Sequence, residues 1–158
     1  MHKIILSTLL LSSFVLAESS YSFLGTQTSF VNYDSVSTPS LGIKYGIQKG
    51  MWRSSINLDY ADNGTNSLTS LILQVDKGIM KEASKDSSFK PHAGFSLGVL
   101  QHDHTIKDKG YGFGLNTGVT YLLSDAIDLD LSYKYMTTSK LNDIDSLHSL
   151  TLSLHYFY

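Results

Sequence analysis

Apolar and polar residues alternate with a period of two along most of the chain after residue 20. This alternation is typical of β-strands with two chemically different faces, because successive side chains point to opposite sides of a strand. Breaks rich in Gly, Asn, Asp and Ser separate the alternating segments. The pattern predicts eight strands, at 21–30, 39–49, 51–61, 67–79, 89–101, 111–123, 127–136 and 147–158.

The predicted strands are long and strongly two-faced. Most have 10–13 residues, whereas strands of globular proteins have about 5–6 and a tilted strand needs about 9–11 to cross a bilayer. In 111–123 one face is apolar and the other carries Gly, Asn and Thr. In 21–30 the assignment of faces is ambiguous, because Tyr21 and Phe23 oppose Leu24 and Phe30 in parity.

Small residues dominate the polar face, which favours a crowded barrel interior over a surface in water. The glycines of this face are Gly42, Gly46, Gly94, Gly98, Gly112, Gly114 and Gly118. Aromatic residues gather at both ends of the predicted strands, as they do at the two interfaces of membrane barrels. These predicted belts contain Trp52, Tyr60, Phe89, Tyr111, Phe113, Tyr121, Tyr133 and Tyr135.

The fold class that follows is all-β: an eight-stranded antiparallel up-and-down transmembrane β-barrel over residues 18–158. The sheet must close, because every backbone group that faces lipid needs a partner. If the N-terminus lies in the periplasm, the turns near 48–51, 81–88 and 124–126 lie on the periplasmic side of the membrane. The outer loops are then 31–38, 62–66, 102–110 and 137–146. A soluble barrel of lipocalin type, with the apolar face inside, is the alternative.

Residues 1–17 are predicted to be a secretory signal peptide. Lys3 precedes an apolar run of about 13 residues, and Val15 and Ala17 place small residues at −3 and −1 of a cleavage site. The run is shorter than the roughly 20 residues of a spanning helix. No later segment has 18 consecutive apolar residues, so we expect no spanning helix in the mature chain.

The composition excludes several classes of binding partner and of chemical site. The 158 residues carry a formal net charge of −2, which gives no basic excess for nucleic acid. The absence of cysteine excludes disulfides, thiolate metal sites, a cysteine nucleophile and a lipidated cysteine. Charged residues make up 16%, below the roughly 25% of ordinary soluble domains. We expect no cofactor.

The polar face carries four cations and four carboxylates, which predicts either a charge-selective pore or a neutralising ionic network that fills the lumen. The eight residues are Lys44, Arg53, Asp59, Asp76, Lys90, Asp128, Asp130 and Lys134. An eight-stranded barrel is just wide enough for side chains to fill it, and the balanced set argues against an ion-selective ring. The filled lumen is favoured, and Arg53 and Asp59 are expected to matter most.

The strand pattern of the whole mature chain, and most specifically the alternating residues from Leu150 to the terminal Tyr158, resembles the small bacterial outer-membrane β-barrels, the superfamily of the OmpA transmembrane domain, OmpX and the opacity proteins. The matching residues are Leu150, Leu152, Leu154, Tyr156 and the terminal Tyr158, which resemble the signal that the barrel-assembly machinery reads. The resemblance implies outer-membrane location, periplasmic chaperones and contact with lipid and lipopolysaccharide, with a monomeric barrel expected. The predicted loops are shorter than those of adhesin-type relatives.

Three groups of residues that contain histidine are candidates for chemistry. His102, Asp103 and His104 supply metal-ligand types, but a further strong ligand is missing and a solvated loop is favoured. His148 and Ser149 are adjacent and so point to opposite faces, which spoils a nucleophile–base pair. His92 and His155 are predicted to point inward near the periplasmic end.

The function predicted from these features is non-enzymatic: a structural or surface-interaction role in the outer membrane. The alternatives are a narrow pore for small solutes or ions and, more remotely, an enzyme that modifies lipid A or phospholipid.

Overall fold

The computed structural model describes residues 20–33, 36–79, 88–103, 107–141 and 144–158. The predicted signal peptide therefore lies outside the described residues. The described residues form eight strands: β1 (Ser20–Tyr33), β2 (Val36–Lys49), β3 (Trp52–Asp62), β4 (Ser67–Gly78), β5 (Phe89–Asp103), β6 (Lys107–Leu122), β7 (Ile127–Ser139) and β8 (Ser146–Phe157). All eight predicted strands are confirmed.

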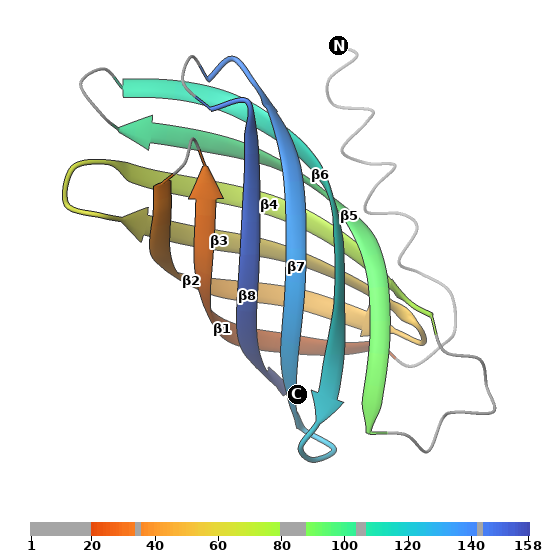
Figure 1. The fold of residues 1–158 in the computed structure, drawn as a ribbon. Helices are drawn as coiled ribbons and strands as arrows, with labels where there is room; N and C mark the ends of the chain where they lie inside the picture. Colours follow the sequence, from red (N-terminus) through yellow and green to blue (C-terminus); the bar gives the residue numbers. More distant parts are fainter. Residues whose placement is uncertain (1–19, 34–35, 80–87, 104–106, 142–143) are drawn as a thin grey trace, which may run out of the picture.

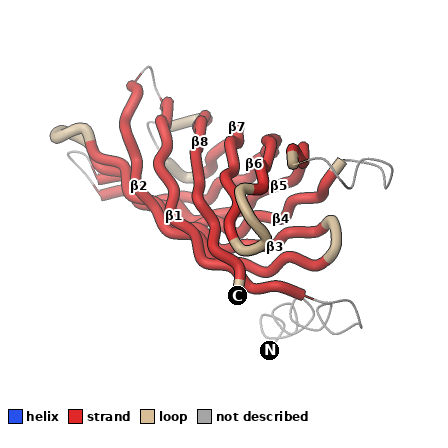
Figure 2. Tube along the Cα trace, turned by 90° about the horizontal axis from the view of Figure 1, so that it is seen from below, coloured by secondary structure: helices blue, strands red, loops and turns tan. Residues whose placement is uncertain are grey.

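The strands form one closed antiparallel barrel in chain order (Figures 1 and 2). Each strand pairs with the next, and β1 closes the sheet against β8 from Phe23–Phe157 to Tyr33–Leu147. The predicted up-and-down fold is confirmed. We call the end where β1 begins and β8 ends the terminal end, and the opposite end the distal end.

The strands extend further at the distal end than the sequence pattern predicts. β1 and β2 pair up to Tyr33 and Val36, and β5 and β6 pair up to Asp103 and Lys107. The predicted loops 31–38 and 102–110 are therefore too long. Strand pairing uses backbone groups, so it continues past the point where the regular apolar alternation stops.

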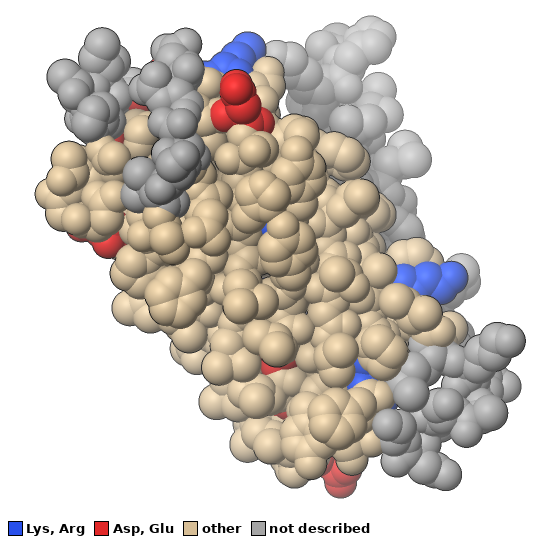
Figure 3. Space-filling model, viewed as in Figure 1, with Lys and Arg blue, Asp and Glu red and all other residues tan. Residues whose placement is uncertain are grey.

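The outer wall is apolar and the interior is polar. The parity of β1 is resolved by this division, because Leu24 and Phe30 are exposed while Phe23 is completely buried. All eight aromatic residues of the predicted belts lie on the outer wall, with exposed fractions from 37% to 58%. Between its two ends the visible wall carries almost no charge (Figure 3). An apolar outside around a polar inside is the arrangement of a transmembrane barrel.

Among the described residues, no helix is long and apolar enough to cross a membrane.

Candidate functional site in the barrel lumen

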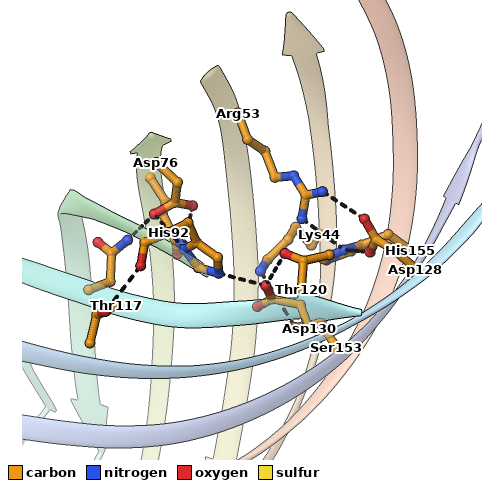
Figure 4. Close-up of polar contacts among 12 residues, drawn as sticks. Lys44, Arg53, Asp76, His92, Thr117, Thr120, Asp128, Asp130, Ser153 and His155 are labelled. Atoms are coloured by element: carbon orange, nitrogen blue, oxygen red, sulfur yellow. Dashed lines mark hydrogen bonds and ion pairs between the residues drawn. The ribbon is translucent and has the colours of Figure 1, made fainter. Parts of the chain in front are cut away.

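Asp128 is the centre of an ionic cluster at the terminal end of the lumen (Figure 4). Arg53 donates from Nη2 to Asp128 Oδ2 at 2.7 Å, and His155 Nδ1 lies 2.7 Å from Asp128 Oδ1. Arg53 also donates to Gln48 Oε1, at 2.7 Å from Nη2 and 3.1 Å from Nε. Asp128 and His155 are both completely buried, so each of them depends on protein partners for its polar atoms.

A second cluster surrounds His92. Its Nε2 lies 2.7 Å from Asp130 Oδ2, and its Nδ1 lies 3.7 Å from Asp76 Oδ1. Thr120 donates to the same oxygen of Asp130 at 2.9 Å. The imidazole therefore joins a carboxylate of β4 to one of β7 across the lumen (Figure 4).

Amides and hydroxyls extend these clusters along the lumen. Asp76 accepts from Gln74 Nε2 at 2.8 Å and from the side-chain amide of Asn116. Asp59 accepts from the side-chain amide of Gln27. Lys44 donates to Ser153 Oγ at 3.5 Å. Charges that leave water are tolerated when they are paired and hydrogen-bonded, and this arrangement supplies such partners.

The structure places the eight predicted lumen residues at different depths. Lys44, Asp76, Asp128, Asp130 and Lys134 are buried inside the barrel. Arg53 and Asp59 are half-buried, and so is Lys90 near the start of β5. Arg53 and Asp59 are not partners of each other, since Arg53 binds Asp128 and Asp59 binds Gln27.

Sequence reasoning placed His92 and His155 inside but did not connect them to the carboxylates. Strand parity shows that a side chain points inward, but it does not show which residue lies across the lumen. That depends on barrel tilt and stagger, which link residues of strands that are not neighbours.

Apolar side chains fill the lumen at its distal end, which the sequence pattern did not predict. We call this group the distal layer. Its members are Val31, Tyr33, Ala61, Leu68, Leu100, Leu141, Ile144 and Leu147. Leu141 and Ile144 come from the connection between β7 and β8, where Thr138 N donates to Asp145 O at 3.0 Å.

Aromatic rings cover the ionic cluster at the terminal end. The guanidinium carbon of Arg53 lies 5.3 Å from the ring centroid of Phe23 and 5.6 Å from that of Phe157. The Phe23 ring also lies 4.9 Å from the His155 ring. The polar groups of the lumen thus lie between two apolar layers. A cavity of about 20 Å³ lies beside Ser40, Asp59, Leu100 and Lys134, which is room for one or two water molecules.

Inward-facing glycines leave space for the large polar residues. A Cβ added at Gly118 would lie 2.8 Å from His92 Nε2 and 2.6 Å from the carbonyl oxygen of Leu131. The same close approach is seen at Gly25 under His155, Gly42 under Asp59, Gly46 under Phe23 and Gly94 under Asp76. A larger residue at these positions would displace the side chains that fill the lumen.

We expect Gly118→Ala to lower the free energy of unfolding by about 1–3 kcal/mol, because the methyl group displaces His92 or the β7 backbone. Gly78→Ala is the matched control. Its Cβ would meet Met51 at an ordinary 3.6 Å, so a change within about 0.5 kcal/mol is expected. Urea unfolding of both variants in vesicles measures the difference, and equal losses would contradict the packing argument.

The other histidine predictions have mixed outcomes. His102 lies within β5 and is buried, with its ring 5.7 Å from that of Tyr33, so the prediction of a solvated loop is wrong for this residue. His104 lies outside the described residues. Within the described ranges no group of three potential metal ligands occurs.

The structure places His148 on the outer wall and Ser149 inside. His148 Nδ1 lies 2.5 Å from the hydroxyl oxygen of Tyr133, and its ring lies 4.8 Å from that of Tyr135. Ser149 is buried in the lumen. The two side chains are therefore separated by the barrel wall.

Closed strand pairing, an apolar wall and a filled polar lumen define the class of small transmembrane β-barrels. No family model matches the chain, and no curated protein matches it in sequence. Solved structures do match its fold. The chain is similar to Neisserial surface protein A (NspA), with 19% identity and a TM-score of 0.72 over 90% of this chain and 100% of that one.

Two structures from Pseudomonas aeruginosa also have a similar fold. Outer membrane protein H (OprH) is 20% identical with a TM-score of 0.66, over 90% of this chain and 100% of that one. The N-terminal β-barrel domain of OprF is 10% identical with a TM-score of 0.57, over 87% and 100%. At these identities the likeness shows the fold alone. The resemblance to small eight-stranded outer-membrane β-barrels is confirmed at that level.

Proposed function

We propose that this protein is a non-enzymatic barrel of the bacterial outer membrane with a structural or surface-interaction role. The observation that carries the proposal is the filled lumen. Asp128, His155, Asp130 and Lys44 are buried there among protein partners, and apolar groups lie above and below them. A lumen packed in this way leaves the outer surface as the part available for interaction.

Other features support the same location. The exposed aromatic residues match the belts that membrane interfaces favour, and the residues of the proposed C-terminal assembly signal, Leu150, Leu152, Leu154, Tyr156 and Tyr158, all face outward. We infer export through the signal peptide at 1–17, periplasmic chaperoning and insertion by the barrel-assembly machinery. The mature monomer then contacts the bilayer and lipopolysaccharide.

The first test is the mobility of the protein from the outer-membrane fraction on SDS gels, unheated and boiled. We expect a heat-dependent shift, because a closed barrel keeps its hydrogen bonds in detergent until it is heated. A protein that is soluble in the periplasm and shows no shift would refute the proposal and favour a soluble ligand-binding barrel.

A planar bilayer then separates the structural role from the narrow pore. We expect no discrete conductance steps from the purified protein, because paired side chains and apolar layers obstruct the lumen. Reproducible single-channel steps would replace the structural role with a pore. Mass analysis of lipid A and phospholipid, with and without the protein, tests the enzymatic alternative, for which we expect no change.

A further inference from the structure

Two lysines and the only tryptophan of the chain form one row on the outer wall at the terminal end. Lys49 at the end of β2 pairs with Trp52 at the start of β3, and Trp52 pairs with Lys77 near the end of β4. Directly opposed residues of antiparallel strands place their side chains on the same face, about 4.5–5.5 Å apart at Cβ. We call these three residues the Lys–Trp–Lys row.

The row holds positive charge at the level of the aromatic belt. Lys77 Nζ lies 5.1 Å from the ring centroid of Trp52. The Trp52 side chain is 48% exposed, and Lys77 is exposed as well. Because indole favours the headgroup level of a membrane, an ammonium group held over it lies where lipid phosphates lie. The row thus combines an apolar anchor with cationic donors.

The charge around the two ends of the barrel differs in sign. Among the described residues that lie outside the lumen, the terminal end carries Lys49 and Lys77 against the single acidic residue Asp125. Among the side chains that the structure describes, the distal end carries Asp62, Asp103, Asp108 and Asp145 against Lys109 and Lys140. An anionic headgroup is therefore better complemented at the terminal end.

We propose that the Lys–Trp–Lys row binds the phosphate of an anionic glycerophospholipid in the leaflet at the terminal end. The proposal rests on the membrane location given above. Each lysine near an anionic lipid surface contributes about fivefold to binding. The row therefore gives this part of the wall a preference for phosphatidylglycerol over the zwitterionic phosphatidylcholine.

Trp52 itself reports the lipid beside the row, because no other tryptophan contributes to the fluorescence. The protein is refolded into vesicles of phosphatidylcholine in which a fixed fraction of lipid carries brominated chains, either as phosphatidylglycerol or as phosphatidylcholine. The ratio of quenching gives the relative affinity for the two headgroups. We expect a preference of about 25-fold for phosphatidylglycerol at low salt, which is about fivefold for each of the two lysines, with a decrease at high salt.

Substitutions assign the preference to the row. Lys77→Gln should reduce it severalfold, and Lys49→Gln with Lys77→Gln should bring it close to one. Lys140→Gln is the matched control, because Lys140 Nζ lies 5.5 Å from the ring centroid of Tyr111 at the distal end. This variant should keep the wild-type preference. A wild-type preference near one, or one that survives the double substitution, would overturn the proposal.

Two further readouts distinguish a bound lipid headgroup from free phosphate and from a barrel that has not inserted. Glycerol phosphate added to the buffer should not abolish the preference, and its abolition would indicate a site for free phosphate instead. The heat-dependent gel shift is measured on the same vesicles. A normal gel shift without a headgroup preference would refute this inference alone. The absence of both the gel shift and quenching by either lipid would refute the membrane location and this inference together.

Discussion

Asp128→Ala is expected to lower the free energy of unfolding by about 3–5 kcal/mol, because it leaves Arg53 and His155 inside the barrel without their shared carboxylate. Both partners lie 2.7 Å from Asp128 oxygens, and His155 is completely buried. Arg53→Ala should cost a similar amount, since it leaves the buried Asp128 carboxylate without its guanidinium. Urea unfolding in vesicles, with the folded fraction read from mobility on unheated gels, measures both losses of unfolding free energy.

The double variant Arg53→Ala, Asp128→Ala tests whether the two residues act as a pair. It should lose less than the sum of the single losses, because removal of both members leaves neither charge alone. Asp125→Ala is the control, since this exposed turn residue should change stability by no more than about 0.5 kcal/mol. Strictly additive losses of unfolding free energy, or no loss in either single variant, would contradict the claim that the Arg53–Asp128 pair stabilises the barrel.

Period-two alternation predicted the eight strands, and the small residues of the polar face together with the aromatic residues at the strand ends predicted the barrel. The repeat is clearest in β6, β7 and β8, and a shift of one residue would turn the apolar side chains of the outer wall into the lumen. It was weakest in β1, because Phe23 breaks the parity that Leu24 and Phe30 follow. Phe23 breaks it because it covers the ionic cluster from inside, so the exception is a packing residue of the lumen.

The sequence predicted which charged residues point inward, but not which of them meet. Arg53 and Asp128 lie 75 residues apart on β3 and β7, so no strand pairing places them together. The distal layer was missed for another reason. Leu141 and Ile144 lie in a connection that is otherwise polar, where isolated apolar residues give no periodic signal.

Leu100→Ala should lower the free energy of unfolding by about 2–5 kcal/mol, because Leu100 is completely buried in the distal layer and its truncation enlarges the adjoining cavity. Leu97→Ala is the matched control on the same strand. Leu97 faces outward with 54% exposure. Lipid chains are as apolar as leucine and replace the contacts that it loses, so a loss below about 1 kcal/mol is expected. Urea unfolding in vesicles compares the two variants.

Conductance of Leu100→Ala in planar bilayers tells which part of the lumen obstructs ions. The distal layer and the ionic clusters act in series, so a smaller Leu100 side chain still leaves Arg53, His92 and their carboxylates across the path. We therefore expect the Leu100→Ala barrel to be less stable but to show no conductance steps. If conductance steps appeared in this variant and not in the wild type, ions would have to pass the ionic clusters around Asp128 and His92. The distal layer would then be the barrier, and the charged residues would line a conducting path.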